Sequence, residues 1–144
     1  MDKNEAFELQ DFLPYLLNQA AEESSLAFQK IYKDRYGMLR TEWRVLFHLG
    51  IYGRMTAKEI GRRSKMHKTK ISRAVARLEE RRFLTRTRDE EDRRLEYLDL
   101  TAMGEAAYRD LRKVATRYDA RLSTDFSDQE LSILRNALRK LARM

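Results

Sequence analysis

Apolar residues recur at helical spacing over most of the chain. From about Pro14 to Tyr36 they lie three or four residues apart, and Gly37 is placed to end that helix. Thr41 is placed to cap a second helix, which should end in the segment from Gly50 to Gly53. Because the chain has one proline and five glycines, long helices are favoured over a sandwich of short strands.

Two shorter helices are predicted next. Thr56 and Glu59 have the spacing of a capping box, which opens a helix that ends near Ser64. The segment from about His67 to Arg82 is predicted to form a further helix. Its opposite face is nearly all cationic, and its buried face carries Ile71, Ala74, Val75 and Leu78.

A hairpin interrupts the helical pattern in the second half of the chain. Alternating apolar residues predict strands over Leu84 to Arg88 and around Leu98 to Leu100, on either side of the charged turn 89–94. The helical spacing returns at Thr101, and Ser127 and Glu130 form a second capping box that opens the last helix. The last two helices carry more apolar surface than one small core needs.

Composition limits the class of protein. With 144 residues, of which 42% are hydrophobic, the chain can bury a core and is predicted to form a single domain. The absence of cysteine excludes disulfides, thiolate nucleophiles, cysteine zinc sites and thiol-based peroxide sensing. No apolar run approaches the roughly 20 residues that span a bilayer, and the chain starts with polar residues, so we expect a soluble cytoplasmic protein.

Positive charge is concentrated in one part of the chain. Between Arg54 and Arg94 there are 15 lysines and arginines against seven acids, an excess of eight. Since the whole chain has a net charge of +7, the other 103 residues carry a net charge of −1. A local basic excess favours a polyanionic partner with salt-sensitive binding. RNA, an acidic membrane surface and a merely solvated helix face are the alternatives from charge alone.

The hairpin and the segments around it resemble the MarR family of bacterial regulators. The wing signature of that family matches Asp92-Arg93-Arg94 followed by Leu100-Thr101-Ala102-Met103-Gly104 with its spacing intact. Upstream similarity includes Leu39 to Trp43, Ile60, Ser64, Ile71 to Arg73 and Leu78-Glu79, so the resemblance extends from about Leu13 to Leu141.

The resemblance implies a mainly α fold with a small β-wing. Residues 38–101 would form a winged helix-turn-helix core, and residues 13–36 and 102–142 would form dimerisation helices of a triangular homodimer. Arg82 departs from the family, which usually has glycine there. Because positive φ is uncommon in other residues, we expect the turn at Arg82 to be built differently.

The resemblance also implies residue roles on double-stranded DNA. The second helix of a helix-turn-helix enters the major groove, so we assign base contacts to Lys68, Thr69, Lys70 and Arg73, and backbone contacts to Ser72 and Arg77. Arg94 would enter the minor groove, with Asp92 holding it through a charge-assisted hydrogen bond. The alternatives are solvated side chains on the helix and an Asp92 that only caps the turn.

Many MarR proteins bind a small aromatic or phenolic effector between the dimerisation helices and the lobe. Asn18, Trp43, Phe47 and His48 are the candidates to line such a pocket here, against the alternatives of plain core for the aromatic residues and a semi-buried structural role for His48. His67 is expected to cap the basic helix or to contact phosphate.

No sequence feature supports catalysis. The chain has no His-Glu-x-x-His motif, phosphate-binding glycine loop or nucleophile elbow, so no enzyme activity, metal or cofactor is expected. The acids at 89–92 suit a hairpin tip better than a metal or nuclease site. The main hypothesis is a ligand-responsive repressor that binds a semi-palindromic operator as a homodimer. The alternative is a sequence-indifferent architectural or replication-associated DNA-binding protein.

Overall fold

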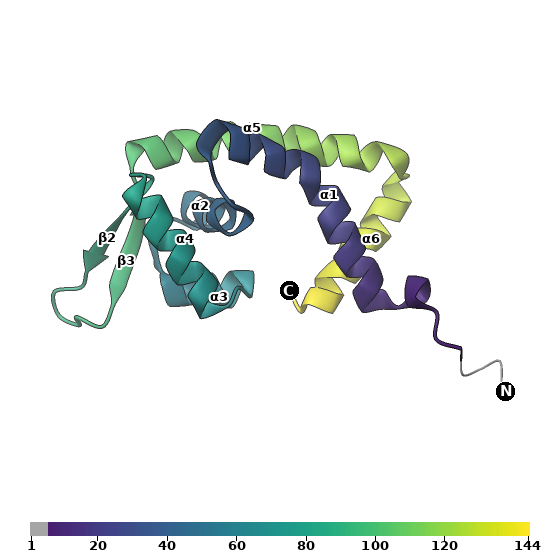
Figure 1. Ribbon diagram of the computed structural model, residues 1–144, viewed down its shortest axis with the longest axis horizontal. Coiled ribbons are helices and arrows are strands. Elements are labelled where there is room, and N and C mark those ends of the chain that lie inside the picture. The colour runs from purple at the N-terminus through teal and green to yellow at the C-terminus, as the bar shows by residue number, and fades with distance from the viewer. Residues whose placement is uncertain (1–5) are drawn as a thin grey trace.

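A computed structural model describes residues 6–144 and shows a lobe and a helical extension that share one long helix, α5 (Figure 1). The elements in chain order are η2 (Leu9–Asp11), α1 (Leu13–Tyr36), α2 (Arg40–Tyr52), β1 (Met55–Thr56), α3 (Ala57–Ser64), α4 (Lys68–Glu80), β2 (Leu84–Arg88), β3 (Glu96–Leu100), α5 (Ala102–Leu122), η3 (Ser123–Asp125) and α6 (Asp128–Ala142). The mainly α fold with a small β-wing is confirmed.

The three strands form one antiparallel sheet in the order β1-β3-β2. Strands β2 and β3 pair from Leu84 opposite Leu100 to Arg88 opposite Glu96, which confirms the predicted hairpin. The two-residue strand β1 adds Met55 opposite Leu98, a pairing too short to leave a periodic signal in the sequence. The sheet therefore ties the start of α3 to the base of the wing.

The turn between α1 and α2 corrects one prediction. Gly37 ends α1 as predicted, with φ 62°, in the left-handed region that favours glycine. Thr41 does not cap α2, because the helix already starts at Arg40 and its N-cap is Leu39. Leucine has no side-chain acceptor, and the Glu42 carboxylate instead accepts a hydrogen bond from the Leu39 backbone N–H at 3.2 Å.

The starts of α5 and α6 follow the sequence pattern fully, and that of α3 follows it in part. Thr101 accepts from the Gly104 backbone N–H at 3.0 Å, and Ser127 and Glu130 form the predicted capping box. Thr56 accepts from the Glu59 backbone N–H at 3.2 Å, which confirms one half of its box. The other half was wrong, because the Glu59 carboxylate turns to the cations that follow it on α3, Arg62 and Arg63.

Arg82 joins α4 to β2 with φ 67°, so the prediction of a differently built turn was wrong. The backbone keeps a left-handed conformation although the residue is arginine, at a cost of about 1 kcal/mol. Its carbonyl accepts from the Thr101 hydroxyl at 2.7 Å, and its N–H donates to the Glu79 carbonyl at 2.9 Å. These bonds hold the strained residue in place.

The hydrophobic core lies in the lobe and extends along the first half of α5. Its fully buried members come from α1, α2, α3, α4, the sheet and α5, and include Tyr32, Leu46, Ile60, Leu78, Leu84, Leu98 and Leu111. The second half of α1 runs beside α5, where the Tyr118 hydroxyl donates to the Ser24 carbonyl (Figure 1). The lobe is therefore closed by residues of this chain alone.

The extension is packed differently. Helix α6 turns back from the far end of α5, and Arg135 ties it there by donating to Asp119 of α5 at 2.9 Å. None of its residues is buried, and its apolar stripe remains open, with Leu134 41% and Leu138 39% exposed. Within residues 6–144, no helix is both long and apolar enough to cross a membrane.

Candidate nucleic-acid interface

Helix α4 separates its apolar and polar residues onto opposite faces. Ile71, Ala74, Val75 and Leu78 are buried against the lobe. The six residues that the sequence assigned to DNA on this helix are all exposed, namely Lys68, Thr69, Lys70, Ser72, Arg73 and Arg77. The structure thus brings these residues together on one outward surface, as 3.6-residue periodicity requires.

The start of α4 is fixed by its neighbours. Lys65 ends α3 in the left-handed region with φ 58°, and Met66 is buried behind the turn. His67 Nδ1 then accepts from the Thr69 backbone N–H at 3.2 Å, which confirms the capping role that the sequence suggested. The first turn of α4 consequently projects Lys68, Thr69 and Lys70 from a rigid position.

Three of the four cations of α4 lack the ion pairs that neighbouring cations form. Arg86 lies 3.1 Å from Glu79 and 3.2 Å from Glu96, and Arg54 lies 2.9 Å from Asp99. In the part of the chain that the structure describes, Lys68, Lys70 and Arg73 have no carboxylate oxygen within 4.0 Å. Their charge is therefore available to an anion outside the chain.

The wing carries a second, oriented cation. Arg94 donates from Nε to Asp92 Oδ1 at 3.0 Å and from Nη2 to Oδ2 at 3.2 Å, while its side chain remains 90% exposed. The same Oδ1 accepts from the Arg94 backbone N–H at 3.1 Å. Asp92 therefore shapes the turn and aligns the guanidinium, so the two sequence alternatives for Asp92 coexist.

Asp89 organises the rest of the wing tip. Its Oδ1 accepts from the backbone N–H groups of Glu91 at 2.8 Å and Asp92 at 3.0 Å, and its Oδ2 accepts from the Tyr97 hydroxyl. The backbone hydrogen bonds lower the pKa of Asp89, and the hydrogen bond from Arg94 lowers that of Asp92. Among residues 6–144 no group of three acids or histidines is placed to hold a metal ion.

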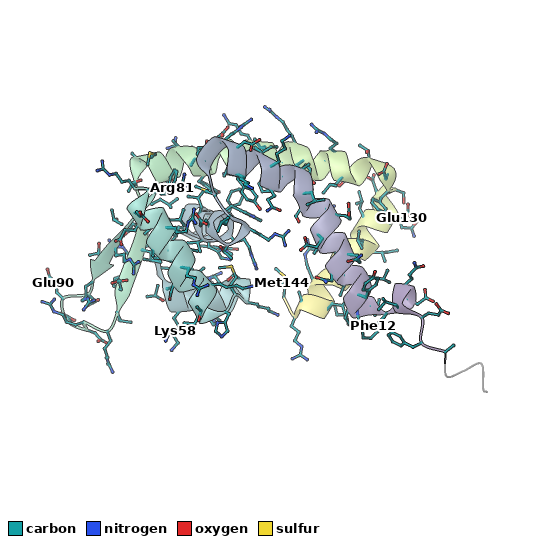
Figure 2. The ribbon with its side chains drawn as sticks, in the orientation of Figure 1. Phe12, Lys58, Arg81, Glu90, Glu130 and Met144 are labelled. Atoms are coloured by element: carbon teal, nitrogen blue, oxygen red, sulfur yellow. The ribbon has the colours of Figure 1, made fainter. Side chains whose placement is uncertain are left out.

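The free cations of α4 and the wing tip lie toward the same edge of the molecule. In Figure 2, Lys58 of α3 and Glu90 of the wing tip lie along the lower edge, whereas Arg81 lies at the opposite end of α4 beside α5. The N-terminal end of α4 adjoins α3 at that lower edge (Figure 1). A protruding helix beside a protruding wing matches the major-groove and minor-groove contacts of winged DNA-binding proteins.

Arg77 has a contact that the sequence did not suggest. Its Nε lies 3.4 Å from Oε1 of Glu42, a fully buried carboxylate of α2, while its own side chain is half exposed. One turn later, Arg81 donates to the Gly37 carbonyl at 2.7 Å. The C-terminal end of α4 is therefore bonded to the turn between α1 and α2 and to the start of α2. Only part of the Arg77 side chain remains exposed.

The missed partner of Arg77 had a weak signal in the sequence. Glu42 is the third residue of α2, where a carboxylate can reach back to the helix start. Thr41, which precedes it, has a side chain typical of an N-cap, whereas Leu39 does not. The long-range contact with Arg77 has no local pattern and depends on how α2 crosses α4.

The four effector-pocket candidates are brought together only in part. Trp43 and Phe47 contact each other edge to face with centroids 5.0 Å apart, and they pack against the core. His48 Nδ1 lies 2.6 Å from the Arg44 carbonyl. Asn18 is exposed on α1. It lies ten residues, or roughly 15 Å along the helix, before Phe28, the residue of α1 that contacts Trp43. Asn18 is therefore separated from the other three candidates.

The chain is similar to known transcriptional regulators. The sequence model of the MarR family matches residues 36–95, from the end of α1 to the wing. The uncharacterized HTH-type transcriptional regulator YwoH of Bacillus subtilis (strain 168) is 28% identical over 118 residues, which cover 81% of this chain and 85% of YwoH.

Solved structures support the same fold. BpsR of Bordetella bronchiseptica, whose DNA binding is regulated by 6-hydroxynicotinic acid, superposes with a TM-score of 0.87 at 19% identity over 96% of this chain and 99% of BpsR. A mutant of MarR from E. coli in complex with operator DNA gives 0.82 at 16% identity over 94% and 99%. Residues 36–95 therefore match the MarR family of transcriptional regulators, and the chain has the winged helix-turn-helix fold of the solved MarR proteins.

Proposed function

We propose that the chain is a sequence-specific, ligand-responsive repressor that binds a semi-palindromic operator in double-stranded DNA as a homodimer. The observation that carries the proposal is the set of unpaired cations on α4, next to a wing whose exposed arginine is aligned by Asp92. Such a surface offers both direct contacts to bases and neutralisation of phosphates.

The residue roles follow from the position of each side chain. Lys68, Thr69, Lys70 and Arg73 would contact base edges in the major groove, because they project from the exposed first half of α4. Ser72 and the exposed part of Arg77 would contact the DNA backbone. Arg94, held by Asp92, would enter the minor groove, where narrow segments concentrate negative potential.

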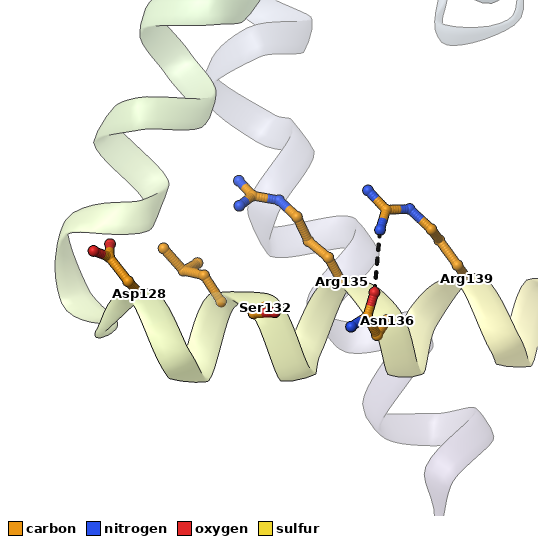
Figure 3. Close-up of a pocket in the computed structure, with 6 residues that line it drawn as sticks. Asp128, Ser132, Arg135, Asn136 and Arg139 are labelled. Atoms are coloured by element: carbon orange, nitrogen blue, oxygen red, sulfur yellow. Dashed lines mark hydrogen bonds between the residues drawn. The ribbon is translucent and has the colours of Figure 1, made fainter.

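The homodimer is supported by the open apolar stripe of α6. Leucines at spacings of three and four residues on this helix are only partly covered by the described part of the chain, and a second copy would bury the rest of their surface. The polar side of the same helix has a different character, since Arg135 and Arg139 extend from it beside Asn136 (Figure 3). We assign dimerisation to residues 13–36 and 102–142, and DNA binding to residues 38–101.

Response to a small aromatic or phenolic effector is supported by the likeness to BpsR, which responds to 6-hydroxynicotinic acid. An effector would act by binding more tightly to the form of the dimer that does not fit the operator. Trp43, Phe47 and His48 remain the proposed lining of the pocket. Asn18 has weaker support as a lining residue, because it lies too far along α1 to contact those residues within one chain.

The test is selection of binding sites from a pool of random duplexes, followed by affinity measurements on the selected site. Lys70→Ala and Arg94→Ala should each weaken operator binding by about 1–3 kcal/mol and leave the dimer intact. Arg86→Ala is the matched control, since Arg86 is already paired with Glu79 and Glu96, and its effect should be smaller.

The selection also separates the alternative functions. A two-fold-symmetric motif supports the proposed repressor, whereas enrichment of no sequence would favour an architectural protein. Cleavage of plasmid in the presence of magnesium would favour a nucleic-acid enzyme. Wild-type affinity of both Lys70→Ala and Arg94→Ala would contradict the residue roles.

A further inference from the structure

A second group of cations lies on α5, on the far side of the molecule from the wing tip. Arg109, Arg112, Lys113 and Arg117, with Thr116 among them, line a shallow surface groove and are all exposed. Their spacing of three and four residues places them on the face opposite the buried Ala107, Tyr108 and Leu111. We call these five residues the α5 ridge. In Figure 2, nitrogen-tipped side chains project upward from α5.

The cations of the α5 ridge form no salt bridge within the described chain, although Lys113 lies near enough to Asp110 to help lower the pKa of that carboxyl. Among residues 6–144, none of the four cations has a carboxylate oxygen within 4.0 Å. Arg109 and Lys113, and Lys113 and Arg117, are four residues apart, a spacing at which like charges destabilise a helix. Like charges at this spacing lower the stability of the helix, and residues that lower local stability in this way are found mostly at functional sites. The pairs therefore suggest that the ridge has a function.

The acids of α5 are used for other contacts. Asp110 accepts from Arg35 at 3.0 Å and from Tyr36 at 2.5 Å, and the hydrogen bond from Tyr36 lowers its pKa. Asp119 accepts from Arg135 of α6. Glu105 stands one turn before Arg109, at the very start of the ridge. The side of α5 from Arg109 to Arg117 thus presents positive charge outward.

The chemistry of the α5 ridge favours a phosphate backbone over other anionic partners. A membrane-surface helix needs an apolar face free to enter the lipid, but the apolar face of α5 is buried against the lobe. A stable protein interface needs an apolar centre, and no large apolar residue lines this groove. Arginine, which makes three of the four cations, matches phosphate with its planar fork of donors.

We propose that the α5 ridge binds the phosphate backbone of a second DNA duplex while α4 and the wing hold the operator. Helix α5, whose exposed face carries the ridge, runs along the edge of the molecule opposite the wing tip (Figure 1), so the two duplexes would not compete for the same residues. The inference rests on the proposed function for the first duplex only. It makes the dimer a bridge between two DNA segments.

The experiment uses an immobilised operator duplex saturated with the full-length protein and a labelled duplex of unrelated sequence in solution. The wild-type protein should capture the labelled duplex at low salt. The triple variant Arg109→Gln, Arg112→Gln, Arg117→Gln changes only the exposed face of α5, so it should remain a dimer and bind the operator normally but lose capture by at least about tenfold. The slope of the logarithm of the capture affinity against the logarithm of salt concentration should become less steep by about 3, since each lost phosphate contact removes nearly one unit of slope.

Two controls test whether position or total charge matters. The triple variant with lysine at the same three positions keeps the charge and should retain most of the capture. The off-ridge control loses three exposed cations elsewhere, through Lys30→Gln, Lys33→Gln and Lys140→Gln. It should capture the labelled duplex as the wild-type protein does. Thermal melting of each variant shows that it is folded, and analytical ultracentrifugation shows that it is still a dimer, because all the changed positions lie in the segments assigned to dimerisation.

Each outcome decides the proposal. No capture by the wild type, equal capture by the glutamine variant, or equal loss in the off-ridge control would overturn it. Failure to bind any operator would count against the proposed function and not against the ridge. In that case the ridge is tested by binding of an unrelated duplex to the Lys70→Ala, Arg94→Ala variant, which should depend on the three ridge arginines.

Discussion

Leucine side chains are buried in the lobe but partly exposed on α6. Leu46, Leu78 and Leu98 are almost completely removed from solvent by neighbours from this chain. Leu134 and Leu138 of α6 follow the same periodicity and remain about two-fifths exposed. The difference shows that this chain closes the core of the lobe by itself, whereas it leaves one apolar face of α6 partly open.

This comparison separates two sources of function. The lobe supplies a rigid α4 and an aligned wing arginine, and it needs no other chain to do so. The extension supplies the surface on which two lobes would be paired. Changes in the lobe should therefore act on folding and on each DNA contact, while changes on α6 should act on assembly.

The largest effect is expected from breaking the apolar stripe of α6. The double variant Leu134→Asp, Leu138→Asp places four charges in the proposed dimer interface. Dimerisation should weaken on the order of 10³-fold, or about 4 kcal/mol. Analytical ultracentrifugation over a concentration series measures the change.

Ser132→Asp is the control for that variant, because it adds charge to the polar side of the same helix (Figure 3). Its dimerisation constant should stay close to that of the wild type. An unchanged dimer in the double leucine variant would show that α6 is not where the copies meet.

A cavity in the lobe should come next in size. Leu46 of α2 is fully buried, and Leu46→Ala removes atoms that neighbouring helices cannot replace. The variant should lose about 3 kcal/mol of unfolding free energy, measured by urea denaturation at fixed protein concentration. Leu39→Ala, at an exposed position beside the same helix, should cost far less. A cost below that of the Leu39 variant would contradict the closed core.

A smaller effect, of opposite sign, is expected at Arg82. Glycine adopts its left-handed conformation without strain, so Arg82→Gly should raise the unfolding free energy by about 0.5–1 kcal/mol. The same denaturation experiment measures it. Arg81→Gly, one residue earlier with φ −88°, gains no such relief and also loses the bond to Gly37, so it should destabilise the lobe. Destabilisation by Arg82→Gly would contradict the strain.

The smallest effect is a local response of the wing tip to acid. The folded pKa values of Asp89 and Asp92 lie below the usual Asp value, so their contribution is complete above about pH 4 and is lost as pH falls through the lowered values. The amide signals of Glu91 and Arg94 in NMR spectra should then shift. The Gly104 amide, which donates to the neutral hydroxyl of Thr101, is the control.

The sequence predicts the helices and the hairpin because local patterns specify them. Apolar spacing gave α1, α4 and α5 to within a few residues, and Gly37 marked a real helix end. Features that depend on tertiary position were missed or wrong. Leu39 is the N-cap of α2 because Glu42 satisfies the backbone from three residues away, and no propensity scale favours leucine there.

The candidate site shows the same division. The outward face of α4 and the contact between Asp92 and Arg94 involve residues close in sequence, so they were predictable. The contacts of Arg77 with Glu42 and of Arg81 with Gly37 join segments more than thirty residues apart. Such contacts depend on how whole helices cross, which a single sequence does not encode in a local pattern.

Hydroxyl-radical footprinting on the selected operator tests the central claim most directly. If two copies of α4 and the wing are displayed by a symmetric pair, both strands should show two equivalent protected segments about one helical turn apart, at roughly 34–36 Å. The pattern should persist in excess unrelated DNA. A single protected segment, or even protection along the whole duplex, would contradict the account.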